Sequence, residues 1–131
     1  LCGSKELIAK AHRLRKMAGG GLRQAGFMAA AASYALDHHV VRLAKDHELM
    51  QHLAQSLSGI PGLQIETPQT NILFIDLVGE AKAKGAALQA HLKQAGIDIT
   101  GLYRLRLVTH LDVDRTGIDR TIAAIRQFFQ A

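Results

Sequence analysis

The sequence contains a single cysteine, Cys2, so the chain cannot form an internal disulfide bond. Disulfides stabilise mainly secreted domains, and their absence here favours a reducing, cytoplasmic setting. Beside Leu1, Cys2 is expected to be a small buried apolar residue rather than a nucleophile. No apolar run approaches the roughly 20 residues that a membrane-spanning helix needs, so no membrane partner is expected either.

Aromatic residues are also scarce, at 5% of the sequence, with no tryptophan. The few present are scattered and offer no platform on which nucleic-acid bases could stack. Positive charge, by contrast, is concentrated: residues 1–25 carry six lysines and arginines against one glutamate, whereas residues 26–131 carry ten cations and ten anions. A basic nucleic-acid-binding domain therefore remains an alternative, although the missing aromatic residues argue against a nucleic-acid partner.

The usual clusters of catalytic or metal-binding side chains are missing. No pair of carboxylates suggests acid-base chemistry, and no phosphate-binding motif of the P-loop type is present. The four histidines between residues 38 and 52 do not share a spacing that would bring them to one helix face, so no metal site is predicted. His110 and Asp112 invite comparison with a catalytic dyad, but no serine or cysteine nucleophile accompanies them, and we assign no catalysis there.

Three consecutive glycines, Gly19 to Gly21, separate two segments of helical composition. Glycine is about 1 kcal/mol less favourable than alanine inside a helix, so this run marks a break. Lys16 and Arg23 flank the glycines, and free N–H groups at a new helix start could bind an anion beside them. A glycine hinge with solvated charges is the other interpretation, which composition alone favours.

Helices are predicted on both sides of the glycines. Ser4 can cap a helix that runs through Met17. Residues 22–58 read as one long helix, because no proline occurs before Pro61. Its apolar stripe has three- and four-residue spacing and would face another helix. The members of that stripe are Leu36, Val40, Leu43, His47, Met50, Ala54 and Leu57.

The rest of the chain alternates between strands and helices. The predicted elements are strands at 63–67 and 71–77, a helix at 81–95, strands at 97–99 and 103–109, and a last helix capped by Asp114. The run 71–77 is almost continuously apolar, which is typical of a strand buried on both faces. Helices separated by pairs of strands predict an α+β fold, with one small, mostly antiparallel sheet and its helices on one face.

Two arginines, Arg104 and Arg106, fall on the same face of the strand predicted at 103–109, because side chains alternate along a strand. A pair of arginines is costly to bury, so this face either meets water or binds an anion. The guanidinium group offers two parallel donors that match a carboxylate. Both interpretations stay open on this pattern alone.

Two separated motifs resemble the low-specificity L-threonine aldolases. They span residues 15–26 and 105–113, in the order of the family's C-terminal part. Leu22 stands where the family often has methionine, a change that conserves side-chain volume. These aldolases are pyridoxal-phosphate enzymes of the aspartate-aminotransferase fold, fold type I. The resemblance covers essentially the whole chain and implies the C-terminal small domain of that fold.

The resemblance also implies how the chain divides. Residues 1–21 would be a remnant of the large pyridoxal-phosphate-binding domain, with its last strand and helix. Residues 22–58 would be a long linking helix, and residues 59–131 the C-terminal small α+β domain. The chain begins with Leu1, and we expect it to be a piece of a longer protein whose missing N-terminal part is its partner. The complete enzyme would be a homo-oligomer, a dimer of dimers.

The implied reaction is cleavage of L-threonine or L-allo-threonine to glycine and acetaldehyde, with pyridoxal 5'-phosphate as the electron sink. The resemblance assigns the α-carboxylate of this small amino-acid substrate to Arg106. It places Lys16 and Arg23 at or near the active site, close to the cofactor phosphate, within one subunit or across a subunit interface. Arg104 has no counterpart with such a role.

One departure from the family concerns the lysine that binds the cofactor covalently. In the family it lies in an upstream Ser-Lys-Gly-Leu-Gly motif, and Ser-Lys-Gly does not occur in this chain. Ser4-Lys5-Glu6 is a different sequence. We therefore expect this piece alone to be inactive. A free-standing α+β binding or regulatory module is the alternative function that the sequence leaves open.

Overall fold

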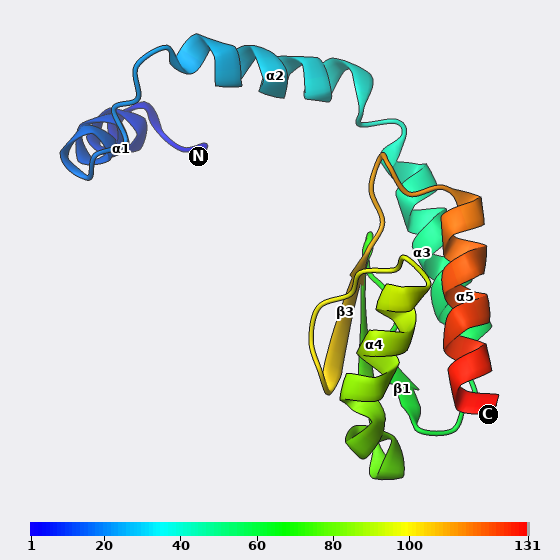
Figure 1. Ribbon diagram of the computed structural model, residues 1–131. Helices are drawn as coiled ribbons and strands as arrows, with labels where there is room; N and C mark the ends of the chain where they lie inside the picture. Colours follow the sequence, from blue (N-terminus) through cyan, green and yellow to red (C-terminus); the bar gives the residue numbers. More distant parts are fainter. Residues whose placement is uncertain (131) are drawn as a thin grey trace. The chain divides into compact units, whose positions relative to one another are not determined.

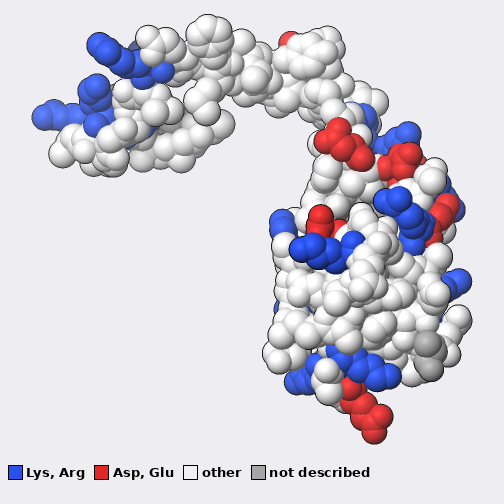
Figure 2. All heavy atoms as spheres, in the orientation of Figure 1, with Lys and Arg blue, Asp and Glu red and all other residues white. Residues whose placement is uncertain are grey.

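The computed structural model describes residues 1–130, and the chain divides into two compact units, Leu1–Val40 and Val41–Ala131. The first unit contains helices α1 (Lys5–Met17) and α2 (Ala25–His38) (Figure 1). Lysine and arginine side chains gather over the α1 part of this unit, as the charge distribution predicts (Figure 2). Among the described residues, no helix has both the length and the apolar character to cross a membrane.

Both ends of α1 are capped. The side-chain oxygen of Ser4 accepts a hydrogen bond at 3.3 Å from the N–H three residues on. At the other end, the N–H groups of Gly19 and Gly20 donate to the carbonyls of Lys16 at 3.2 Å and Arg15 at 2.8 Å. Gly19 has a φ of 82°, a left-handed conformation that glycine adopts without strain. The glycine run therefore ends α1 in a Schellman motif.

The first unit has no buried residue, which contradicts the expected burial of Cys2. Residues 1–4 also do not form a strand. On α2, the large apolar side chains of Phe27, Met28 and Leu36 are 81%, 67% and 70% exposed. No element of this unit packs over them, because two short helices alone cannot enclose a core.

The prediction of one continuous helix over residues 22–58 is wrong. α2 ends at His38, and helix α3 (Leu43–Leu57) begins after a turn. The turn contains the neighbouring β-branched residues Val40 and Val41, which lose side-chain freedom in a helix. Packing also differs, since α2 has no buried residue whereas α3 has six. α3 is thus part of the core of the second unit.

The second unit is an α+β structure built on a three-stranded antiparallel sheet in the order β1-β2-β3. The strands are β1 (Leu63–Ile65), β2 (Ile72–Leu77) and β3 (Arg104–Val108). The helices α3, α4 (Gly85–Gln94) and α5 (Arg115–Gln130) pack on one side of it, and a 3-10 helix, η1 (Gly79–Lys84), leads into α4 (Figure 1). This is the predicted fold class.

The hydrophobic core lies between the sheet and these helices. Leu73 and Ile75 of β2 and Leu105 of β3 are at most 1% exposed, as are Leu53 and Leu57 of α3. Fully burying one such side chain stabilises a fold by about 1.5–3 kcal/mol. The inner face of the sheet is therefore the part of the chain whose position is most strongly determined by packing.

The prediction that the second strand is buried on both faces is wrong. Burial alternates along β2, and the residues of its outer face, Ile72, Phe74 and Asp76, are only half-buried. The helices cover the inner face alone, so the outer face is left to side chains of neighbouring strands. The apolar residues on both faces of β2 had suggested that a second layer of helices or strands covers the outer face. The described residues contain no such layer.

The strand predicted at 97–99 does not form. Only Thr100 reaches β3, where it makes an isolated bridge with Arg106. Gly96 and Gly101 have φ values of 71° and 90°, so the chain turns on both sides of the segment. These two left-handed turns leave the segment too short to continue the ladder along β3.

A hydrogen bond between His52 of α3 and Asp119 of α5 joins these helices, with Nε2 and Oδ1 2.9 Å apart. The hydrogen bond from His52 holds the pKa of Asp119 below its ordinary value of 3.8, and Arg115 adds to this effect. Because the pKa is lower in the folded chain than in the unfolded chain, the pair stabilises the fold above about pH 4. That contribution is lost as the pH falls through the folded-state pKa.

Asp119→Asn should therefore lower the thermal midpoint of the chain at pH 6, and the difference from the unchanged chain should be smaller at pH 3. The effect is expected to be small, because Asp119 is 53% exposed. Asp98→Asn is the control, since Asp98 forms no ion pair with the described residues. An equal loss at both pH values would contradict the assignment.

Candidate functional site

β3 carries two arginines on the face of the sheet away from the helices, and their surroundings differ. Nη2 of Arg104 lies 2.6 Å from Oε1 of Glu66, and its Nη1 donates to Oδ2 of Asp76 at 2.8 Å. Its Cζ also lies 4.6 Å from the centroid of the Phe74 ring. The hydrogen bond to Glu66 raises the pKa of Arg104. Arg104 therefore links β3 to β2 and to the residue that follows β1, and both of its terminal nitrogens are already paired.

Arg106 has an exposed side chain that makes no hydrogen bond or ion pair with any of residues 1–130. Its backbone, by contrast, is held on both sides. Its N–H donates to the carbonyl of Thr100 at 2.8 Å, and it pairs with Phe74 of β2 across the sheet. A guanidinium with a fixed backbone and unused donors is suited to bind a carboxylate through two parallel hydrogen bonds.

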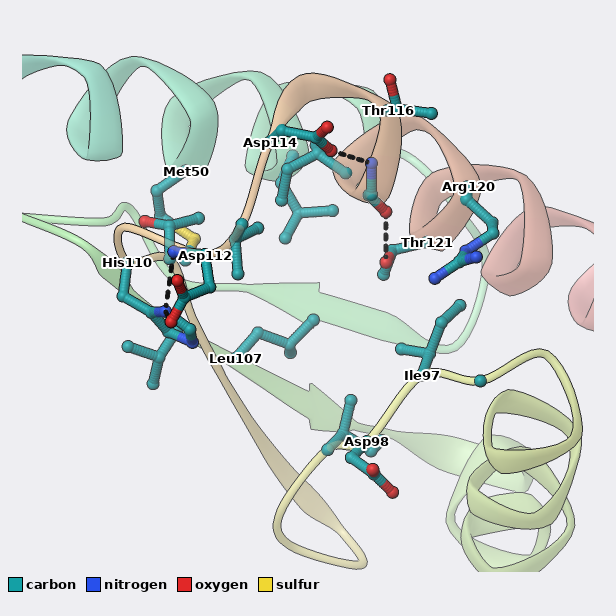
Figure 3. A pocket seen from close by; sticks show the side chains of 18 of the residues that line it. Met50, Ile97, Asp98, Leu107, His110, Asp112, Asp114, Thr116, Arg120 and Thr121 are labelled. Atoms are coloured by element: carbon teal, nitrogen blue, oxygen red, sulfur yellow. Dashed lines mark hydrogen bonds and ion pairs between the residues drawn. The ribbon is translucent and has the colours of Figure 1, made fainter.

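A pocket of about 560 Å³ lies beside Arg106. It is bounded by residues 96–100, the end of β3 and the first turns of α5 (Figure 3). The open segment 97–99, which does not pair with β3, leaves room for it. A pocket of this size can hold a small molecule.

Two aspartates near this pocket lie in the segment that leads from β3 into α5. The N–H of Asp112 donates to Nδ1 of His110 at 3.3 Å, and Asp114 accepts a bond from the N–H of Gly117 at 2.8 Å (Figure 3). Asp112 is therefore a turn residue and Asp114 the cap of α5, as predicted. Over residues 1–130, no group of three or more histidine, cysteine or acidic side chains could hold a metal ion.

The other two predicted site residues, Lys16 and Arg23, lie in the first unit. Both are exposed, and neither forms an ion pair with a described residue. Lys16 folds back over the glycine run, with its Nζ 2.8 Å from the position that a Cβ of Gly21 would take. Arg106 belongs to the second unit, so a common site of these three residues stays a prediction.

The residues that hold Arg106 in place were missed by sequence reasoning. Thr100 accepts a bond from the N–H of Arg106, Asn71 bonds to the backbone of Thr109, which follows β3, and Thr109 bonds to the carbonyl of Asp46 on α3. Thr109 did carry a signal, because a polar side chain on the buried face of an apolar strand requires a hydrogen-bond partner. Thr100 and Asn71 carried none, since exposed polar residues of this kind are common in turns.

Comparison with known proteins assigns the chain to a family. The family described as beta-eliminating lyase matches residues 1–80. The chain belongs to this family. Over 128 residues, or 98% of its length, the chain is 41% identical to a low-specificity L-threonine aldolase of Escherichia coli K12. Over 131 residues, or 97% of its length, it is 30% identical to low-specificity L-threonine aldolase 1 of Arabidopsis thaliana.

The chain spans 37% of the length of each of these curated relatives. Among solved structures, it is similar to a transaminase described with L-Ala, with a TM-score of 0.69 and 15% identity. That likeness covers 97% of this chain and 35% of the transaminase. The resemblance to threonine aldolases and the aminotransferase fold are both confirmed.

Proposed function

We propose that this chain is part of a longer low-specificity L-threonine aldolase, here named the complete enzyme. It would cleave L-threonine and L-allo-threonine to glycine and acetaldehyde. The observation that carries the proposal is the free guanidinium of Arg106, in a chain that matches the Escherichia coli aldolase along 98% of its length. A free-standing binding or regulatory module has no comparable support.

Arg106 would bind the α-carboxylate of the amino-acid substrate. Two parallel hydrogen bonds from one guanidinium fix the plane of the carboxylate, and thereby the direction of the Cα–Cβ bond that breaks. The carboxylate is not itself changed by the cleavage, so this contact persists from bound substrate to product. Arg106 would thus contribute mainly to substrate affinity.

Lys16 and Arg23 fit the phosphate of pyridoxal phosphate by their chemistry. Both are exposed cations without an ion-pair partner among the described residues, and the missing side chain of Gly21 leaves room for the Lys16 ammonium. Threonine aldolases and the aminotransferase-like neighbours are pyridoxal-phosphate-dependent families. When bound, the cofactor supplies the electron sink for carbon–carbon cleavage. The covalent lysine is assigned to the upstream part, since Ser-Lys-Gly is absent here.

The exposed apolar side chains of α2 support a larger assembly. Surfaces of this kind are normally covered by other parts of a protein or by another subunit. We place residues 1–21 in the large domain and residues 59–131 in the small one, with α3 in the small domain's core. We also propose that the complete enzyme is a cytoplasmic homotetramer, a dimer of dimers.

The missing lysine provides the test of this proposal. Incubating the chain alone with pyridoxal phosphate, followed by borohydride reduction and peptide mass mapping, should show no site-specific adduct. The complete enzyme should be labelled at one lysine upstream of Leu1 and should release acetaldehyde from L-threonine, whereas the chain alone should not. A stoichiometric adduct at a single lysine of this chain, such as Lys16, would show that the assignment is wrong.

A further inference from the structure

Thr109 follows the end of β3 and has a fully buried side chain, at 0% exposure. Its hydroxyl donates to the carbonyl of Asp46, in the first turns of α3, at 2.8 Å. Its N–H donates to the carbonyl of Asn71 at 3.0 Å, and its own carbonyl accepts a bond from Nδ2 of Asn71 at 2.7 Å. These three residues, which we name the Thr109 clamp, join α3, the start of β2 and the end of β3.

The clamp acts on the strand that carries Arg106. A buried hydroxyl without a partner is costly, so the Thr109 side chain has a strong preference for the position in which it reaches Asp46. Asn71 bonds to both backbone polar groups of Thr109, since its carbonyl accepts from the N–H and its side-chain amide donates to the carbonyl. These two bonds fix the position of β3 along β2. The end of β3 is therefore tied to the core at a point three residues beyond Arg106.

The Arg106 side chain, by contrast, has no partner of its own among residues 1–130, and its position depends on its backbone. On the outer edge of β3 that backbone is held through the bridge with Thr100. A displacement of about 1 Å in a substrate-binding group can reduce activity by about 100-fold. The distance between the guanidinium and its ligand is thus sensitive to whatever holds the end of β3.

We propose that Thr109 and Asn71 are positioning residues, which place the Arg106 guanidinium for the substrate carboxylate. This inference rests on the proposed function and extends it from the residue that binds the carboxylate to the residues that hold it. Thr109 lines the pocket beside Arg106, but its side chain is 0% exposed, so the clamp is not itself a ligand-binding group. It acts through the backbone of β3, and its loss would weaken affinity for the carboxylate at every stage of the reaction.

The test uses the complete enzyme with Thr109→Val, which keeps the shape of the side chain and removes its hydroxyl. We expect KM for L-threonine to rise about 10-fold while kcat changes less than about 2-fold, because only uniform binding is lost. The dissociation constant of glycine, followed by the absorbance of the bound cofactor, should rise by the same factor. Thr109→Ser restores the hydroxyl and should bring both values back to within about 3-fold.

Leu88→Val is the control for a loss of core packing alone, because Leu88 is also buried, at 0% exposure, lies on α4 and does not line the pocket beside Arg106. It should leave KM unchanged. If Thr109→Val does not fold, Asn71→Ala is the second variant. It removes the half-buried side-chain amide that bonds to the carbonyl of Thr109, and it should raise KM about 3-fold or more. All constants are to be measured below the thermal midpoint of every variant.

Four outcomes would overturn the inference. A lowered thermal midpoint with unchanged KM and glycine affinity would make Thr109 structural only. If Thr109→Ser does not recover the affinity, the loss in Thr109→Val does not come from the missing hydroxyl. If Arg106→Ala itself leaves KM unchanged, the proposed role of Arg106 fails. If Arg106→Ala raises KM and Thr109→Val does not, the proposed function stands and the clamp alone is refuted.

Discussion

Arg106→Ala in the complete enzyme should raise KM for L-threonine by about 100-fold or more, with a smaller change in kcat. The substitution removes a charged, two-pronged hydrogen bond to the carboxylate, and losing one partner of such a pair weakens binding by about 2–5 kcal/mol. Arg106→Lys should recover only part of the affinity, because an ammonium group cannot present two parallel donors. Steady-state kinetics with L-threonine provide both constants.

Arg104→Ala is the control for this experiment, because Arg104 lies on the same strand and the same face. Its guanidinium is already paired with Glu66 and Asp76, both at the surface of the sheet. Exposed pairs of this kind contribute little to stability, so their loss should leave the fold of β3 in place. Because Arg104 is assigned no contact with the substrate, KM should then change by less than about 3-fold. Equal effects of the two substitutions would show that general positive charge, rather than a specific contact of Arg106, attracts the substrate.

Ile75→Ala should destabilise the chain by about 2–5 kcal/mol in denaturant unfolding. Ile75 lies on the central strand β2, is 0% exposed and packs on the helices, so its truncation leaves a cavity that the surrounding core cannot fill. A loss of this size is a large part of the 5–15 kcal/mol that a domain usually has. The free energy of unfolding should be extrapolated from the midpoint and slope in urea.

Ile72→Ala on the same strand tests the one-sided burial of the sheet. Ile72 points to the outer face and is only half-buried, so its truncation should cost less than about 1.5 kcal/mol. If the two substitutions destabilised the chain equally, the outer face of β2 would be as well packed as the inner face. The sequence prediction of a strand buried on both sides would then be restored.

Local signals predicted much of this fold correctly. Ser4 and Asp114 cap α1 and α5 as expected, since a cap depends on residues only a few positions away. The helical prediction for residues 22–58 was wrong, because it relied on a continuous pattern and on the absence of proline. Whether a helix continues through two β-branched residues depends on what its next turn packs against.

The candidate site was only partly predictable. Alternation along the strand correctly placed Arg104 and Arg106 on one face, and the family resemblance selected Arg106. Composition could not show that Arg104 is already paired, because Glu66 and Asp76 lie far from it in the sequence. The positions of Lys16 and Arg23 relative to Arg106 remain a prediction.

The sequence by itself determined the family, the α+β class and the glycine break after α1, because motifs and periodicity are properties of short segments. Tertiary structure alone decided which of two neighbouring arginines has no ion-pair partner among the described residues, and which residues hold its strand. Both depend on contacts between residues more than 25 positions apart in the chain, including the bonds of Arg104 to Asp76 and of Thr109 to Asn71 and Asp46. Such contacts form only when the strands and helices pack, and no local pattern records them.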